Sequence, residues 1–123
     1  MNPIPQKLRN EMAADPFYQE CCLTGTPARF EKVDWHHCWK FANKQINEKF
    51  AIVPVWWYMH SPLGSPESVH NCRLTEIQVK LISLNRATKE DLAKYPMDWE
   101  KERKRLEYEL NEKKVIHILK VGK

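Results

Sequence analysis

Two adjacent histidines stand in the stretch VDWHHCW, residues 33–39, and a third, His60, follows the apolar run at residues 50–58. Imidazole is a common ligand of divalent metals and the side chain whose pKa is best matched to neutral pH. Neighbouring side chains of a strand point to opposite faces, so His36 and His37 cannot do the same work there. If the two strands pair antiparallel, His36 and His60 converge. The spacing therefore suits metal binding by this pair while His37 faces a different direction, although two polar residues on a hairpin, or partly buried and hydrogen-bonded histidines, would also explain it.

Two β-rich segments have to position these side chains. Residues 28–39 combine aromatic and β-branched residues and favour a strand or hairpin, while residues 50–58, FAIVPVWWY, form the most strand-like run. Pro54 places that second strand at an edge or an end of its sheet. The polar, basic residues 40–49 predict a connecting loop that can include a short helical turn. Residues 61–68, SPLGSPES, predict another loop.

Helical patterns flank these segments. Residues 4–14 favour a helix that Asp15 and Pro16 end. After the second loop, one helical face carries apolar residues at helical spacing: Leu74, Ile77, Leu81 and Leu84. Thr88 with Asp91 predicts a helix start, and Asp98 opens a charged helix. Residues 115–121 fit either a final strand or an extension of that helix. Strands and helices are thus segregated, which predicts an α+β fold and not a βαβ one.

The composition sets the class of the chain. Its 123 residues suit one domain, with a core at about 21–85 and a helical segment at about 88–123. The net charge of +4 suits a polyanionic partner without requiring one. No apolar run is long enough to span a membrane, and the first residues lack an apolar signal core, so a cytoplasmic protein is expected. The four cysteines form no C-x-x-C pair and are expected to be reduced and buried.

Read together, residues 21–60 resemble the HNH endonuclease family, whose fold is the ββα-metal hairpin with a helix. "WHH" matches the first motif of that family, "AIVPV" its second strand and "WWYMH" its closing histidine. The resemblance implies that His36 and His60 bind the metal and that His37 is the general base. It also extends to small phage- and prophage-type HNH-like proteins and would then cover most of the chain. It implies a metal-dependent DNA endonuclease that leaves 5′-phosphate and 3′-hydroxyl ends.

Two departures from the family pattern bear on this hypothesis. The middle asparagine of the family falls on Ala51, so Asn43, Gln45 or Asn47 would have to replace it, with Asn47 or Gln45 preferred. The cysteines that often form a zinc knuckle are replaced by Trp56 and Met59, so packing must hold the hairpin. These departures keep an alternative open, namely a degenerate HNH fold that binds nucleic acid without turnover. A structural zinc protein is a third reading, with ligands among the histidines and cysteines.

The ligands and the charges predict the partners of an active enzyme. Two imidazoles favour one divalent ion such as Mn²⁺, Ni²⁺ or Zn²⁺ over Mg²⁺, and His70 is a further candidate ligand or phosphate contact. DNA is the expected partner, and a nonspecific nuclease holds it mainly through phosphates. The candidate cations are Lys40, Lys44, Lys49 and Arg73. Many small nucleases of this family act as dimers, so a homodimer is one of the oligomeric states left open.

Overall fold

The computed structural model describes residues 3–121, with side chains as far as residue 113. Within that part the chain is a small α+β protein of five α-helices, two 3-10 helices and two antiparallel two-stranded sheets, which confirms the predicted class. The elements in chain order are α1 (Gln6–Ala13), η1 (Pro16–Gln19), β1 (Val33–His37), β2 (Lys40–Phe41), β3 (Lys44–Gln45), η2 (Lys49–Ala51), β4 (Ile52–Trp56), α2 (Trp57–His60), α3 (Arg73–Arg86), α4 (Lys89–Ala93) and α5 (Trp99–Val121).

The larger sheet pairs the two strands that carry or precede the histidines. β1 and β4 run antiparallel, with His36 opposite Val53 and His37 opposite Ile52. The carbonyl of Pro54 accepts a hydrogen bond from the N–H of Cys22 at 2.9 Å, on the edge of β4 that faces away from β1. The nitrogen of a strand residue faces the same way as its carbonyl, so the N–H that proline lacks is not needed for pairing with β1. The predicted edge position of Pro54 is confirmed.

Two segments differ from the sequence-based prediction. Residues 40–49 are not a plain loop, because β2 and β3 pair within them as a small hairpin. Its turn residues Ala42 and Asn43 have positive φ angles of 53° and 66°, a conformation that alanine rarely takes and that the sequence does not announce. The predicted strand at 50–58 is also too long. A 3-10 turn precedes it, and the chain turns helical at Trp57.

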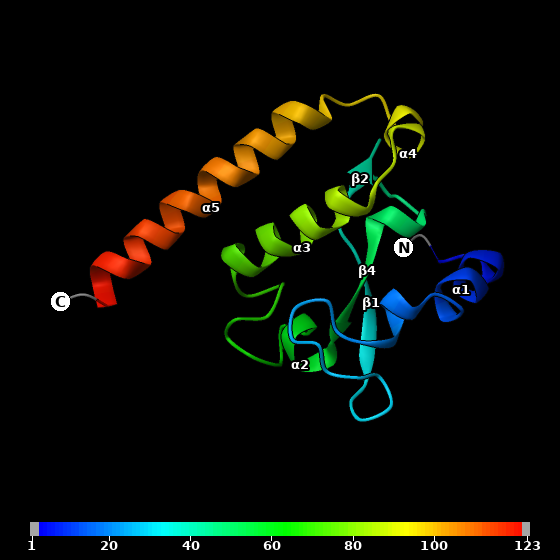
Figure 1. Cartoon of the computed structure of the whole chain (residues 1–123), viewed down its shortest axis with the longest axis horizontal. Helices are drawn as coiled ribbons and strands as arrows, with labels where there is room; N and C mark the ends of the chain where they lie inside the picture. The colour runs from blue at the N-terminus through cyan, green and yellow to red at the C-terminus, as the bar shows by residue number, and fades with distance from the viewer. Residues whose placement is uncertain (1–2, 122–123) are drawn as a thin grey trace.

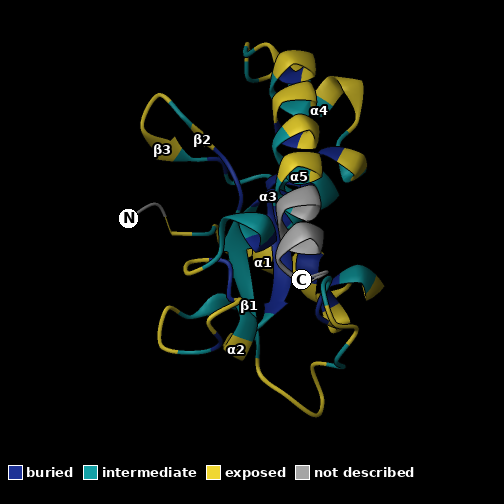
Figure 2. Ribbon diagram, turned by 90° about the vertical axis from the view of Figure 1, so that its left-hand side faces the viewer, coloured by how far each residue is buried: buried dark blue, intermediate teal, exposed yellow. Residues whose placement is uncertain are grey.

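The core lies on both sides of β4. Val53 and Val55 are fully buried in a cluster that includes Ile77 of α3 and Leu106 of α5. On the other side, Ile52 joins a smaller cluster made by α1 and η1. Figure 1 shows α5 running along α3, with β1 and β4 between these helices and α1. β4 is buried from Ile52 to Val55, whereas β1 is only half-buried along its length (Figure 2), which leaves the side chains of β1 accessible.

The C-terminal helices follow the predicted signals. The hydroxyl of Thr88 accepts from the N–H of Asp91 and the Asp91 carboxylate accepts from the N–H of Thr88, so the predicted helix start is a complete capping box. Residues 115–121 continue α5, so they form the helix extension and not the final strand. Their side chains, including that of His117, lie outside the described ones. None of the helices in residues 3–121 is long and apolar enough to cross a membrane.

The cysteines are free thiols. Cys21 and Cys38 are buried, as expected, whereas Cys22 and Cys72 are only half-buried. Burial raises the pKa of Cys22 to about 12 and raises that of Cys38 as well. Both thiols therefore stay protonated at neutral pH, and they serve the packing of the core instead of chemistry.

Candidate metal centre and the neighbouring histidine

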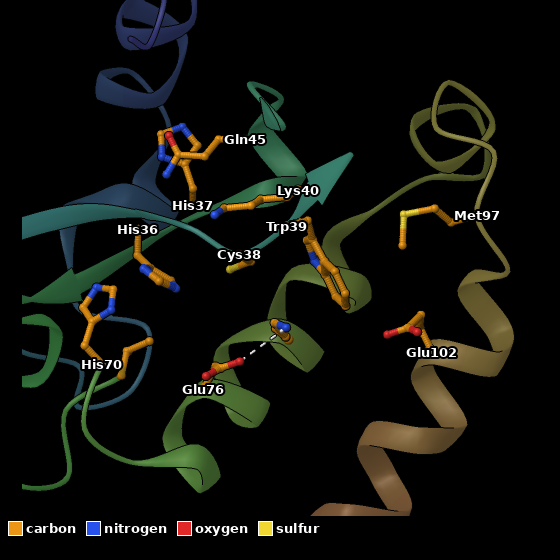
Figure 3. Close-up of a pocket in the computed structure, with 12 residues that line it drawn as sticks. His36, His37, Cys38, Trp39, Lys40, Gln45, His70, Glu76, Met97 and Glu102 are labelled. Carbon is orange, nitrogen blue, oxygen red and sulfur yellow. Dashed lines mark ion pairs between the residues drawn. The ribbon is translucent and has the colours of Figure 1, made fainter. Parts of the chain in front are cut away.

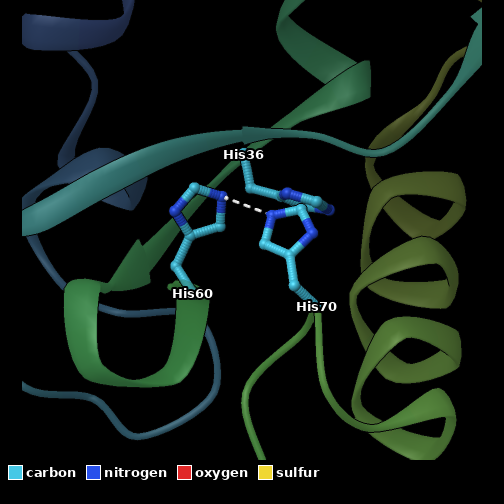
Figure 4. Close-up of side chains that lie close together, drawn as sticks. All are labelled: His36, His60 and His70. Atoms are coloured by element: carbon cyan, nitrogen blue, oxygen red, sulfur yellow. Dashed lines mark hydrogen bonds between the residues drawn. The ribbon is translucent and has the colours of Figure 1, made fainter. Parts of the chain in front are cut away.

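Three histidines from separate parts of the chain meet on one face of β1. His36 comes from β1, His60 from the end of α2, and His70 from the segment that leads into α3 (Figure 4). One ring nitrogen of each lies within 4.8 Å of those of the other two. The Nε2 atoms of His60 and His70 are 3.3 Å apart. The convergence of His36 and His60 follows the strand alternation expected from the sequence, and the structure adds His70 to it.

The cluster could hold a divalent metal ion, although its nitrogens spread over as much as 4.8 Å. Two nitrogens bound at about 2.05 Å to a tetrahedral ion lie roughly 3.3 Å apart, which is the separation of the His60 and His70 nitrogens. Burial, reinforced by the neighbouring His60 and His70, lowers the pKa of His36 to about 3. Burial also lowers the pKa of His70. Both rings are therefore neutral at pH 7, and each has a lone pair on one ring nitrogen. To bind a metal through Nε2, His70 would have to carry its proton on Nδ1, because its Nε2 donates to Nε2 of His60 in this structure.

Asp34 orients His60. Its Oδ2 accepts a hydrogen bond from Nδ1 of His60 at 3.1 Å, and it shares a face of β1 with His36 because the two residues are two positions apart. With the proton held on Nδ1, the lone pair of His60 lies on Nε2, which faces the cluster. Metal-binding histidines are commonly fixed in this way by a carboxylate. Asp34 is absent from the residues predicted for the site, although an acidic residue two positions before a candidate ligand is a signal for this role.

His37 lies on the opposite face of β1 and contacts Asn47. Nε2 of His37 is 2.7 Å from Oδ1 of Asn47, and the Nδ2 group of Asn47 donates to the carbonyl of Pro3 at 3.0 Å. A carbonyl can only accept, so the amide nitrogen of Asn47 must face Pro3 and its oxygen must face His37. The proton of the neutral His37 ring is therefore on Nε2, and the lone pair is on Nδ1. Asn47, one of the two residues expected to replace the missing asparagine at the buried Ala51, makes this contact.

The position of His70 depends on the loop between α2 and α3. The N–H of Ser65 donates to the carbonyl of Tyr58, and that of Val69 donates to the carbonyl of Met59, each at 2.7 Å. A Cβ atom on Gly64 would lie 2.3 Å from the carbonyl oxygen of Tyr58, so only glycine fits there. These contacts fold the loop back onto α2 and bring His70 beside His60. No spacing rule in the sequence predicts this fold of the loop.

A cavity of about 500 Å³ opens over the site, and we call it the histidine cavity. The residues that line it come from the N-terminal segment, α1, β1, the small hairpin and the three-histidine cluster: Pro3, Ile4, Arg9, Trp35, His36, His37, Lys40, Gln45, His60 and His70. Because Trp35 and His36 point to opposite faces of β1, the cavity must extend across the edge of β1 that β4 does not cover. A neighbouring hollow lies toward α3 and α5 and shares His36, His37 and Lys40 with it (Figure 3).

The predicted phosphate-binding cations are dispersed. Lys40 lines the histidine cavity, as does Gln45. Lys44 lies on β3 and does not line it. The ammonium of Lys49 is 2.8 Å from the carboxylate of Asp15. The guanidinium of Arg73 binds two carboxylates, those of Glu76 and Glu109. The structure thus brings only one of the four cations to the cavity.

Comparison of the chain with models of known families, with curated proteins and with solved structures gave no significant match. What the site can do therefore follows from its own chemistry. The three imidazoles could hold a metal ion, and among the described residues no cysteine or carboxylate joins them as a fourth ligand. A fourth histidine, with its lone pair on Nδ1, lines the same cavity and can accept a proton there.

Proposed function

We propose that this protein is a metal-dependent DNA endonuclease of the HNH type. The observation that carries the proposal is the convergence of His36, His60 and His70 beside a separate, tautomer-fixed His37 in one open cavity. Metal-assisted hydrolysis of a phosphodiester needs both a metal that is accessible to substrate and a base that is not itself a metal ligand. The division of the adjacent histidines between two faces of β1 meets both needs.

The arrangement of the elements supports the same proposal. The antiparallel pair of β1 and β4 followed by α3 has the order of a ββα-metal core, with α1, α4 and α5 as flanking helices. The first strand carries His36 and His37, and the second ends just before His60, as in the motif order of the family. Asn47 takes over the contact to the base that the sequence at Ala51 cannot provide.

Each protein group has a definite task in this reaction. A divalent ion held by His36, His60 and His70 would neutralise charge on the scissile phosphate and on the departing 3′ oxygen. Nδ1 of His37 takes a proton from the attacking water, while Asn47 accepts the hydrogen bond from Nε2 and stabilises the imidazolium that forms. Asp34 keeps the ring of His60 in the tautomer that binds a metal. The expected products carry 5′-phosphate and 3′-hydroxyl ends.

The ligand count favours a catalytic site over a structural zinc site. Structural zinc sites close with four protein ligands, whereas catalytic sites keep an open position for water or substrate. The described residues supply three, and these three line an open cavity. Three imidazoles also favour Mn²⁺, Ni²⁺ or Zn²⁺ over Mg²⁺, which prefers oxygen ligands. We place the activity in a reducing cytoplasm, where the four free thiols would persist.

Nicking of supercoiled plasmid tests the proposal. We expect conversion to open circles with Mn²⁺ or Ni²⁺, loss of activity with chelator, and a decrease of about 10²–10⁴-fold in the His37→Ala variant. Calorimetric titration of the same variant with Ni²⁺ should show undiminished metal binding, because His37 is not a ligand. Binding of plasmid without nicking under any metal would favour the degenerate binding module. A variant that nicks as fast as the unmodified protein would exclude His37 as the base.

A further inference from the structure

Arg9 is held at the rim of the histidine cavity. It lies on the exposed side of α1, its Nε donates to the carbonyl of Ile4 at 3.1 Å, and its guanidinium carbon lies 5.7 Å from the centre of the Trp35 ring. The hydrogen bond and the contact with the aromatic ring restrain a side chain that would otherwise be mobile. The guanidinium group is therefore positioned before any ligand arrives.

The charge of Arg9 is not neutralised within the described part of the chain. Arg73 binds Glu76 and Glu109, and Arg86 lies 3.4 Å from Asp15, but no described carboxylate forms an ion pair with Arg9. One of its five N–H groups bonds to Ile4, which leaves four for a ligand. A planar guanidinium with free donors is suited to bidentate binding of a phosphate.

The location of Arg9 relates it to the proposed reaction. Trp35, over which its guanidinium lies, shares a face of β1 with His37 because the two are two residues apart. Arg9 lines the histidine cavity and also a shallower hollow that continues from it past Asp34 and His60. An anion at Arg9 would thus lie beside the metal-binding cluster but outside it. In a polynucleotide, that anion is a phosphate next to the one that is hydrolysed.

We propose that Arg9 binds a backbone phosphate of the DNA adjacent to the scissile phosphate, and that it is a principal phosphate contact of this site. The inference rests on the proposed nuclease function. Arg9 thus takes the phosphate-binding role predicted for Lys49 and Arg73, whose charges are already neutralised by carboxylates. It lies 27 positions before His36, and no spacing rule connects it to the histidines. A single free phosphate could use the same chemistry, so the test separates the two sources.

The experiment measures binding in a protein that cannot cleave. In the His37→Ala background, fluorescence anisotropy of a labelled duplex with Mn²⁺ gives Kd as a function of salt. We expect Arg9→Gln to weaken binding at least about tenfold at low salt, because a hydrogen bond to a charged group is lost. The slope of log K against log salt should fall by about 0.9, which corresponds to one phosphate contact. Arg9→Lys should recover part of the affinity, since lysine keeps the positive charge but lacks the planar group that donates two parallel hydrogen bonds.

Arg73→Gln is the matched control, because it removes the same charge from an arginine that already binds two glutamates. We expect its Kd to stay within about twofold of the parent. Thermal unfolding and Ni²⁺ titration of each variant show that the fold and the metal site are intact. Unchanged affinity and slope for Arg9→Gln, with DNA bound by the parent, would overturn this inference and leave the nuclease proposal standing. Absence of both binding and nicking by the unmodified protein would overturn both. Inorganic phosphate that binds as tightly as the duplex would indicate a small-anion site and overturn the inference.

Discussion

The carboxylate of Asp34 is expected to strengthen metal binding through the ring of His60. The change that tests this is Asp34→Asn, which keeps the size of the side chain and removes its charge. The side chains of Asp34 and His60 are 25% and 22% exposed, so the pair is partly shielded from water but not deeply buried. The measured quantity is the dissociation constant for Ni²⁺, because it reports on the ligands without requiring turnover.

The size of the effect follows from the geometry. The 3.1 Å contact, the width of an imidazole ring and a metal–nitrogen bond of about 2.1 Å place the carboxylate about 7 Å from the metal. A single negative charge at about that distance from a divalent cation contributes about 1 to 2.5 kcal/mol for an effective dielectric constant between about 80 and about 40. Loss of a hydrogen-bonded partner of a metal ligand typically weakens affinity by about 10- to 100-fold, or about 1.4–2.7 kcal/mol. The electrostatic contribution and the typical loss of binding free energy therefore agree.

Isothermal titration with Ni²⁺ can measure a change of this size. Glu31→Gln is the matched control, since Glu31 is exposed, lies three residues before Asp34 and loses the same charge without any contact to the histidines. We expect Asp34→Asn to raise Kd about 10- to 100-fold and Glu31→Gln to change it less than about twofold. Equal affinities for Asp34→Asn and the unmodified protein would refute the role of Asp34. Equal losses of Ni²⁺ affinity in both variants would show that the overall negative charge near the site, and not the contact with His60, sets the affinity.

Four further outcomes are expected. Initial nicking rates should be higher with Mn²⁺ than with Mg²⁺ at equal concentration, and equal or faster rates with Mg²⁺ would count against an all-imidazole site. Asn47→Ala should lower kcat about tenfold or more while Ni²⁺ affinity in calorimetry stays unchanged, because only the orientation of the base is lost. Leu106→Ala should lower the free energy of unfolding in urea by about 2–5 kcal/mol, since Leu106 is fully buried. The hydrogen bond from the Lys49 ammonium, and to a lesser extent that from the N–H of Phe17, lowers the pKa of Asp15. The ionised carboxylate therefore stabilises the fold above its unfolded pKa of about 3.9. This stabilisation is lost as pH falls through the lower pKa of the folded state. Urea unfolding of Asp15→Asn should therefore show a deficit at pH 7 that shrinks toward pH 3, and a constant deficit would contradict this assignment.

The parts of the site that follow from strand periodicity could be predicted from the sequence. His36 and His60 converge, and His37 turns away, because alternation along β1 and antiparallel pairing with β4 leave little choice. His70 could not be placed in the same way. Its position depends on hydrogen bonds between the loop at 61–72 and the backbone of α2, including those of Ser65 and Val69, and these have no periodic signature.

Contacts between distant segments also escaped prediction. Arg9 and Pro3 reach the site only because α1 packs on the side of the sheet that carries Trp35, which no local pattern announces. Conversely, Lys49 and Arg73 have the right charge in the right part of the sequence, but carboxylates just before η1 and in α3 and α5 bind them. The hairpin of β2 and β3 was missed because Ala42 and Asn43 take positive φ angles where the sequence offers no glycine.

The order Trp35-His36-His37-Cys38 ties the proposed function to the register of a single strand. A shift of β1 by one residue in one direction would bring His37 to the face beside His60 and His70, and Cys38 to Asn47. A shift in the other direction would bring His36 to Asn47, and Trp35 to the face beside His60 and His70. Either misfolded form retains one histidine in a useful place and never two. A preparation in which some molecules have the first of these shifts would therefore contain more candidate metal sites than complete sites, whereas molecules with the second shift would contain neither.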